Sequence, residues 1–183
     1  MALVTPHRPV LLLLAAFSRY SEAIAWARKT AEDAWGPVAL QSDLFDHRET
    51  NYYEATMGAD LKKTFFAFES LVDPAELVEC KETSNQWEID YQQLGKHPES
   101  RPLNLDPGYL TEAKLILATT KDRDHRIYLD RSIYAENTLF FHRGAWQPRP
   151  WTYPDYLRAD YHAFFDRCRE YLRQRYQQPE EFA

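Results

Sequence analysis

Eight consecutive apolar residues near the N-terminus, Val10 to Phe17, limit the folds open to this chain more than any other segment. A helix needs about 20 apolar residues to cross a bilayer, so the run is too short for a membrane span. Its length favours a strand that is buried on both faces, although its leucines and alanines leave a helix open. The run therefore predicts the interior of a globular domain.

A helix and a second strand follow this run. Ser21 is predicted to cap the helix, which continues at helical spacing to Trp35. Gly36 and Pro37 end it in the order that helix C-termini favour, and residues 37–42 are the next predicted strand. The chain thus opens as a β-α-β unit.

The middle of the chain predicts a third strand and a second helix. Aromatic residues in 63–69 indicate a strand, and residues 73–76 (Asp-Pro-Ala-Glu) are a strong helix start. The helix is expected to run to Leu94 or to split in two at residues 82–85, which are poor helix formers.

Two segments further along are ambiguous. Residues 103–110 suggest a strand interrupted at Asp106-Pro107-Gly108, and because proline cannot donate to a ladder we expect an edge strand or a turn. Residues 112–120 are apolar in the middle and fit either a helix or a strand.

Residues 126–129 and 133–141 form the clearest predicted hairpin. Ile127 and Leu129 lie on its alternating apolar face, which is expected to point inward. We expect a turn of three residues at 130–132.

This register decides which polar side chains meet. With the three-residue turn, Tyr128 faces Tyr134 and Arg126 faces Glu136, whereas a two-residue turn would shift the pairing. The polar face is then either an ion pair beside an aromatic pair or a wall that faces a ligand.

A last helix is expected to begin near Pro154. Its predicted buried stripe is Leu157, Tyr161, Phe164, Phe165, Cys168 and Leu172. The order β-α-β-β-α-β, with an added hairpin and a C-terminal helix, predicts an α+β, ferredoxin-like sandwich. We expect one domain over residues 1–183 with a frayed tail at about 177–183.

Composition excludes several classes of protein. The 183 residues are 44% hydrophobic and 27% charged, which argues against a disordered chain or a fibre. Cys80 and Cys168 lie far apart without partners at metal spacing and predict buried free thiols. No signal peptide is evident, so a cytoplasmic protein without a membrane partner is expected.

Charge is distributed unevenly. The net charge is −6, but residues 1–110 carry 10 basic and 17 acidic groups, whereas residues 111–150 carry 7 and 5. The acidic first part argues against nucleic acid as a partner. The basic block is the first place to look for a small anionic ligand.

No familiar catalytic motif is present. The five glycines form neither a P-loop nor a dinucleotide-binding loop, and G-x-S-x-G and H-E-x-x-H are missing. The sequence names no cofactor and predicts no metal site, since a site would need Asp106, His125, Glu136 and Asp155 to assemble in the fold. Whether the protein is an enzyme stays open.

The candidate site lies at the start of the hairpin, where hydroxyls and cations precede a histidine. Its candidate ligand-binding residues are Thr119, Thr120, Lys121, Arg123, Arg126, Tyr128 and Tyr134. The candidate acid–base residues are Glu136, Asp106 and His125. Each group also has a structural alternative: a solvated loop, a tight turn or a cross-strand ion pair.

Five motifs, taken together, resemble the bacterial and archaeal family called domain of unknown function 4416. They are Leu103-Asn104-Leu105-Asp106-Pro107-Gly108-Tyr109, Ala118-Thr119-Thr120-Lys121-Asp122, His125-Arg126-Ile127-Tyr128-Leu129, Ile133-Tyr134-Ala135-Glu136 and Pro150-Trp151-Thr152-Tyr153-Pro154-Asp155-Tyr156. The resemblance spans about 9–176 and implies no established reaction. The turn at 130–132 departs from it, because a glycine is expected there.

Three functions remain open from the sequence. The leading hypothesis is a domain that binds a nucleotide or a phosphorylated metabolite at the polar face of the 125–141 hairpin. The alternatives are a non-catalytic protein–protein interaction module and a single-stranded nucleic-acid binder. The first two differ in whether Tyr128, Tyr134 and Trp151 line a cleft or an exposed patch. The oligomeric state is not predicted.

Overall fold

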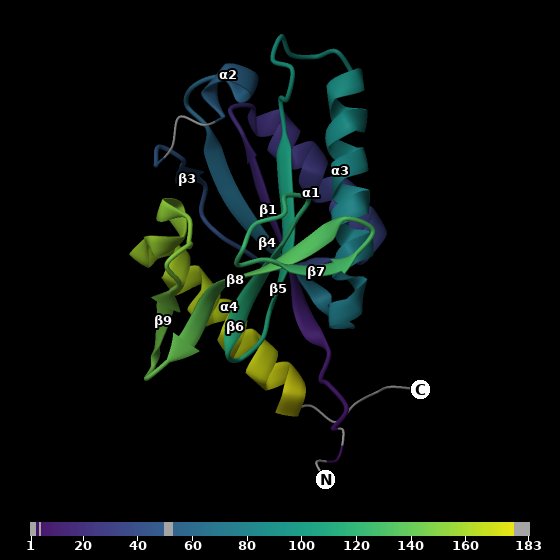
Figure 1. Cartoon of the computed structure of the whole chain (residues 1–183). Coiled ribbons are helices and arrows are strands. Elements are labelled where there is room, and N and C mark those ends of the chain that lie inside the picture. The colour runs from purple at the N-terminus through teal and green to yellow at the C-terminus, as the bar shows by residue number, and fades with distance from the viewer. Residues whose placement is uncertain (1–2, 4, 50–52, 178–183) are drawn as a thin grey trace.

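The computed structural model describes residue 3 and residues 5–49 and 53–177 of the chain. Within them, strands and helices are interleaved in the first part of the chain, and a run of strands then precedes the last helix (Figure 1). The strands are β1 (Val10–Ser18), β2 (Val38–Gln41), β3 (Phe45–Asp46), β4 (Lys62–Val72), β5 (Asn104–Leu110), β6 (Lys114–Thr119), β7 (Ile127–Asp130), β8 (Ile133–His142) and β9 (Ala145–Pro148). The helices are α1 (Ser21–Trp35), α2 (Glu54–Met57), α3 (Leu77–Gln93) and α4 (Ala159–Gln177), and 3-10 turns span Pro74–Glu76 and Pro154–Leu157.

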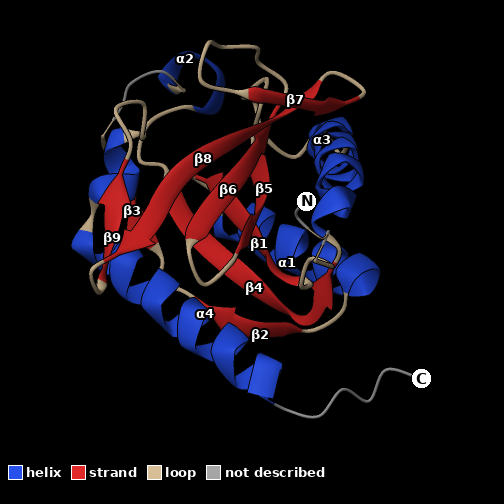
Figure 2. Ribbon diagram, turned by 60° about the horizontal axis from the view of Figure 1, so that its bottom comes forward, coloured by secondary structure: helices blue, strands red, loops and turns tan. Residues whose placement is uncertain are grey.

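The strands of the described residues join into one antiparallel sheet with helices on both faces. Its order is β2-β4-β1-β5-β6-β8-β7, with β3 paired to β4 and β9 paired to β8. Helices α1 and α3 pack on one face and α4 on the other (Figure 2). The sheet thus separates two apolar clusters, the α1/α3 cluster and the α4 cluster.

Strand β1 lies inside this sheet and is buried along its whole length. Leu11 and Leu13 belong to the α4 cluster, and Leu12 and Leu14 belong to the α1/α3 cluster. Because full burial of one leucine stabilises a fold by about 1.5–3 kcal/mol, the two-sided strand contributes to both clusters. The prediction of a strand buried on both faces is confirmed.

The predicted fold class is confirmed only at its coarser level. The molecule combines helices with an antiparallel sheet, as expected for an α+β protein. The ferredoxin-like sandwich is not confirmed, because the strand order of the whole sheet differs from the expected one. Helix α4 also covers the face that a two-layer sandwich leaves bare.

Each apolar cluster contains one cysteine. Cys80 lies on α3 in the α1/α3 cluster, and Cys168 lies on α4 in the α4 cluster. Both are buried free thiols, as predicted. Burial raises the pKa of Cys80 to about 12 and also raises the pKa of Cys168, so both thiols stay protonated near neutral pH.

The helix ends differ from the predictions in two places. Ser21 is the first helical residue rather than the cap, and the capping position is held by Tyr20 without a side-chain bond. Helix α3 does not split, because Ser84 is buried and its hydroxyl donates to the Lys81 carbonyl one turn earlier. The predicted start at Asp73 is confirmed by a complete capping box.

Strand β5 is continuous, so the predicted turn at residues 106–108 is wrong, whereas the alternative of an edge holds locally, because Pro107 pairs with β1 and not with β6. Pro107 pairs opposite Leu14 of β1, and pairing with β6 begins only at Gly108. A Cβ on Gly108 would lie 2.3 Å from the carbonyl oxygen of Ile116, so only glycine lets β6 approach here. The ambiguous segment 112–120 forms β6.

The hairpin of β7 and β8 has the predicted register but a different turn. Arg131 and Ser132 form a two-residue turn with positive φ angles of 47° and 59°. A bulge between Tyr128 and Asp130 compensates, so Tyr128 still pairs with Tyr134. The predicted buried apolar face of the first strand is wrong, because β7 is the last strand of the sheet order and all its residues are exposed.

The C-terminal helix buries the predicted stripe except at its start. Leu157 is 51% exposed because it lies in the 3-10 turn before α4. Residues 178–183 of the predicted frayed tail lie outside the described residues. Among the described helices, none combines the length and the apolar character needed to span a membrane.

Candidate functional site

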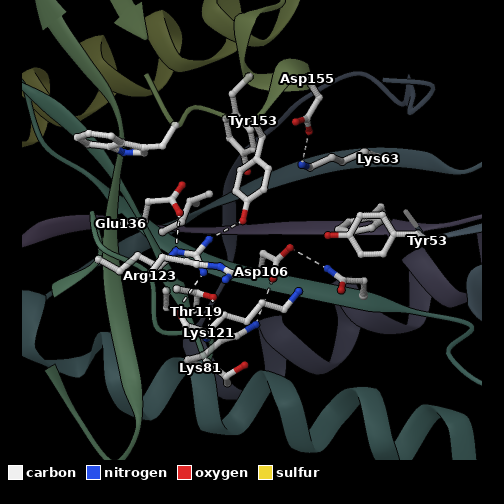
Figure 3. A pocket seen from close by; sticks show the side chains of 18 of the residues that line it. Tyr53, Lys63, Lys81, Asp106, Thr119, Lys121, Arg123, Glu136, Tyr153 and Asp155 are labelled. Carbon is white, nitrogen blue, oxygen red and sulfur yellow. Dashed lines mark hydrogen bonds and ion pairs between the residues drawn. The ribbon is translucent and has the colours of Figure 1, made fainter. Parts of the chain in front are cut away.

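A cleft of about 600 Å³ opens where β5 and β6 separate (Figure 3). Its walls come from β1, β4, β5, β6, β8 and α3, from the segments 119–126 and 151–156, and from His47, Glu49 and Tyr53. Gly108 is the first β5 residue that pairs with β6, so Asn104–Asp106 have β1 as their only strand partner. The break in pairing leaves this part of β5 facing the cleft.

Side chains of α3 bond the backbone that β6 leaves unpaired. The amide of Leu105 donates to Glu88 Oε1 at 2.7 Å, and its carbonyl accepts from Lys81 Nζ at 3.0 Å. Arg101 holds the same Glu88 carboxylate with two nitrogens, at 3.0 and 2.9 Å. Helix α3 therefore replaces the missing strand and keeps the cleft floor ordered.

Asp106 lies on this floor as an ionised carboxylate. It accepts hydrogen bonds from Lys81 at 3.2 Å and from Asn104 at 2.8 Å. Burial acts to raise the pKa of Asp106, but Lys81, Lys63 and the Asn104 hydrogen bond outweigh burial and hold the pKa below its usual value. Asp106 is thus fixed as an acceptor.

Arg126 connects three parts of the cleft wall. Its Nε donates to Glu136 at 2.8 Å, and its two terminal nitrogens donate to the Lys121 carbonyl at 2.9 Å and the Tyr153 hydroxyl at 2.7 Å. The backbone amide of Arg126 also donates to the Arg123 carbonyl at 3.0 Å. Arg126 therefore orders the loop that carries Lys121 and Arg123.

His125 and Glu136 form a second contact on this wall. His125 Nε2 lies 3.2 Å from Glu136 Oε2, and the imidazole stacks on Trp151 with ring centroids 4.9 Å apart. Trp151 is itself held by a bond from its indole nitrogen to the Asn137 carbonyl. The buried Glu136 thus touches the one histidine of the candidate set, an arrangement that can move a proton.

A buried ion pair closes the opposite wall. Lys63 Nζ donates to Asp155 Oδ2 at 2.7 Å, and both side chains are almost fully buried. The ammonium also lies 4.4 Å from the centre of the Tyr156 ring and 5.3 Å from that of Phe17. Aromatic faces and one carboxylate compensate for its lost hydration.

The cleft carries more positive than negative charge. Six lysines and arginines line it against four acidic residues, an excess of two in a protein whose net charge is −6. Within the described part of the chain, the Arg123 guanidinium has no hydrogen bond or ion pair, and Lys121 projects beside it (Figure 3). Arg123 therefore brings to the cleft a positive charge that pairs with no carboxylate among the described residues.

The structure gathers most of the candidate residues in one place. Those that line the cleft are Thr119, Thr120, Lys121, Arg123, Arg126, His125, Glu136 and Asp106. Tyr128 and Tyr134 do not line it but contact each other edge to face, with centroids 5.6 Å apart. Asp106, His125, Glu136 and Asp155 also line the cleft, yet within residues 3, 5–49 and 53–177 no three such groups are placed to hold a metal.

Sequence reasoning missed the residues that come from the first half of the chain. Lys63 lies in a strand rich in aromatic residues, and Lys81 follows the apolar Leu77 by one helical turn and so lies on the same face of the helix. Both positions could therefore have indicated a buried cation, and both lysines are buried. His47 and Tyr53 follow no pattern that could have indicated them. Tyr153 occurs within the motif 150–156, whose sequence alone indicates no role for it in a site.

Comparison with known families agrees with the resemblance drawn from the motifs. The model of a family described as a domain of unknown function (DUF4416) matches residues 8–171. The match includes all the residues that line the cleft. No curated protein and no solved structure matches the chain.

Proposed function

We propose that this chain, which belongs to the DUF4416 family, binds a small anionic molecule such as a nucleotide or a phosphorylated metabolite in its cleft. The observation that carries the proposal is the exposed Arg123 guanidinium, which has no hydrogen bond or ion pair among the described residues and lines a cleft of about 600 Å³. Ligand pockets commonly measure about 300–1,000 Å³, so the cleft suits a metabolite-sized molecule.

Arg123 suits the grip on an anion better than the other cations of the cleft. Lys63, Lys81, Arg101 and Arg126 each hold a carboxylate of the protein. Arg123 is exposed, and its planar guanidinium can bind a phosphate or carboxylate through two parallel hydrogen bonds. Thr119 and Thr120 add hydroxyl donors on the same loop.

The same geometry supports a chemical role for Glu136 and His125, with Asp106 as an orienting acceptor. The pair can take a proton from a bound hydroxyl and return it, because the carboxylate and imidazole lie in contact inside the cleft. If the protein turns its ligand over, we propose proton transfer at the ligand as the class of reaction.

Thermal shift on a panel of nucleotides, sugar phosphates, dicarboxylates and inorganic phosphate tests the binding proposal. A ligand at 100 times its Kd stabilises by about 2.7 kcal/mol, which raises Tm by about 5–10 °C for a domain of this size. Arg123→Ala is expected to lose most of that shift. Arg126→Ala is a poor probe of binding, because Arg126 donates hydrogen bonds to three parts of the cleft wall and its loss would disturb the wall itself.

Lys96→Ala is the matched control, since it also removes one exposed positive charge but lies in the loop after α3, outside the cleft. It is expected to keep the wild-type shift. A panel without any shift, or an Arg123→Ala variant that shifts as far as wild type, would remove the proposal.

A second candidate, the protein–protein interaction module, is supported by β7. This last strand of the sheet order exposes Ile127 and Tyr128, with exposed fractions of 70% and 57%, and an open strand edge can pair with another strand. For a second copy of this chain as partner, sedimentation velocity should show dimers that Ile127→Lys abolishes. Identical monomers for both proteins would count against it.

The finer fold assignment is also a proposal. We propose that β1, α1, β2, β4, α3 and β5 form a ferredoxin-like unit to which the later elements are added. The support is that β4 lies between β2 and β1, that β1 lies between β4 and β5, and that α1 and α3 share one face. An experimental structure in which one of these strand neighbours differs would contradict it.

A further inference from the structure

Two buried polar side chains in the cleft have no hydrogen-bond partner. Among the described residues, the two ring nitrogens of His47 and the hydroxyl of Tyr156 have no hydrogen-bond partner. His47 is 7% exposed and Tyr156 is 2% exposed, and both line the cleft. Buried polar groups are rarely left unsatisfied, so these atoms call for a partner.

The surroundings of His47 offer carboxylates, but none within bonding distance. Its Nδ1 lies 3.7 Å from Asp155 Oδ2 and 3.7 Å from Glu49 Oε2. Asp155 already accepts from Lys63 at 2.7 Å, and Glu49 accepts from Arg158 at 2.9 Å. Burial first, and Lys63 second, lower the pKa of His47, so the neutral ring keeps one free donor and one free acceptor.

The Tyr156 ring is fixed while its hydroxyl is not bonded. The ring stacks on Phe165 and carries the Lys63 ammonium over its face. Burial, followed by the charges of Asp155 and Asp106, raises the pKa of Tyr156, so the phenol stays protonated. Tyr156 lines the cleft together with both carboxylates.

The inner end therefore differs in character from the loop that bears Arg123. The lining cation at this end, Lys63, is neutralised by Asp155, and the rings of Phe17, Phe65 and Tyr156 lie around its ammonium. Figure 3 shows Lys63, Asp155 and Tyr53 on one side of the cleft and Arg123, Lys121 and Thr119 on the other. Neutral donors and acceptors in such a setting suit a hydroxyl group better than a second anion.

We propose that His47 and Tyr156 form a subsite for the hydroxyl-bearing part of a ligand whose anionic group is held at Arg123. The inference rests on the proposed function and narrows its ligand class to phosphorylated or carboxylated polyols and sugars. A site that hydrogen-bonds a ligand hydroxyl rejects analogues that lack it, since its own polar groups then stay unpaired.

Isothermal titration of the wild-type protein with three probes tests this ligand class without any mutation. Ribose 5-phosphate carries the anion and hydroxyls, propyl phosphate carries the anion on an apolar chain, and inorganic phosphate carries the anion alone. Ribose 5-phosphate is expected to bind at least tenfold more tightly than propyl phosphate. Equal affinities would overturn the subsite.

Tyr156→Phe tests the residue itself, with Tyr161→Phe as the matched control. Both variants remove one buried, unbonded hydroxyl next to the same aromatic cluster, but Tyr161 does not line the cleft. Tyr156→Phe is expected to weaken the affinity for ribose 5-phosphate at least fivefold and to leave the affinity for inorganic phosphate within twofold of the wild-type value. Tyr161→Phe should change neither affinity.

The failures of the two proposals are distinguishable. If Tyr156→Phe and Tyr161→Phe bind ribose 5-phosphate equally tightly, only a water occupies the His47 and Tyr156 end of the cleft and the subsite is wrong. The proposed function is still supported in that case if Arg123→Ala loses affinity for both ribose 5-phosphate and inorganic phosphate. If wild type binds none of the three probes but is stabilised by another anion of the thermal-shift panel, the subsite is wrong and the proposed function stands.

Discussion

At the scale of single residues, the cleft depends on charges that are buried in pairs. Arg126 and Glu136 are 5% and 2% exposed at their side chains, and the same arginine holds the backbone of Lys121. Removing one member of a buried pair leaves the other charge without compensation. Arg126 is therefore a positioning residue, and its loss should be felt in stability first.

Arg126→Ala is expected to lower the free energy of unfolding by about 3–5 kcal/mol. The reason is that Glu136 then stays buried without its arginine and keeps, among the described residues, only the weaker contacts with His125 and Thr138. Urea unfolding measures the loss, and the double variant Arg126→Ala with Glu136→Gln should recover part of it. A loss below about 1 kcal/mol in the single variant would show that the pair is not what holds this wall.

His47 is expected to make the protein less stable in mild acid. Burial and Lys63 lower its pKa in the folded state below the usual 6.5. Between the two pKa values the unfolded chain takes up a proton that the folded protein does not, so stability falls as the pH drops below about 6.5. Urea unfolding at about pH 7.5 and 5.5 should show that His47→Gln reduces this fall by up to about 1 kcal/mol. Parallel pH profiles would contradict this assignment.

At the scale of elements, the cleft exists because β5 changes partner in mid-strand. Gly108 admits β6, and the preceding residues bond Lys81 and Glu88 of α3 instead. Local sequence could not reveal this change, since Asp106-Pro107-Gly108 is also a common turn. What decides between turn and strand is the pairing with β1, a contact between residues about 90 positions apart.

Gly108→Ala is expected to destabilise the fold by about 1–3 kcal/mol. The new methyl would meet the Ile116 carbonyl oxygen at 2.3 Å and push β6 away from β5. Gly95→Ala is the control, because nothing lies within 4 Å of its Cβ position and only its positive φ of 64° disfavours alanine. Thermal unfolding of both should place Gly108→Ala lower, and the reverse order would argue against the close approach.

The hairpin shows the opposite balance between local signal and context. Alternation along residues 126–141 predicted both strands and the facing of Tyr128 and Tyr134. It did not predict the two-residue turn, because the bulge next to Leu129 restores the same register. It also did not predict exposure of Ile127, which depends on β7 being the last strand of the sheet order.

At the scale of the whole molecule, the proposed anion site lies in a protein whose net charge repels anions. The net charge is −6, and the local excess of two positive charges lies beside the cleft. Salt screens charges over about 10 Å at 0.1 M and about 30 Å at 0.01 M. Attraction at short range therefore competes with repulsion at long range.

The Kd of a phosphate ligand should rise severalfold between about 10 and 200 mM salt, because the contact at Arg123 is exposed. Arg123→Ala should show a much flatter dependence, and Lys96→Ala should keep the wild-type slope. Titration calorimetry at several salt concentrations measures this. A salt-independent Kd in wild type would show that the charge of the loop 119–126 does not contribute to binding.

The sequence could predict the loop side of this cleft but not its opposite wall. Residues 119–126 stand next to one another, so their charge and hydroxyl content are visible in the chain itself. Lys63 and Asp155 are 92 positions apart and meet only because the 3-10 turn before α4 packs over β4. Contacts between distant elements follow from the packing of whole layers, which a periodicity of 2 or 3.6 does not encode.

The two cysteines give each helical layer its own chemical reporter. Cys80 is covered by the α1/α3 cluster and Cys168 by the α4 cluster, and both thiols stay protonated in the folded protein. Only the thiolate reacts with alkylating reagents, so each cysteine is labelled when its own layer opens. The order of labelling under mild denaturation thus records which side of the sheet the molecule uncovers first.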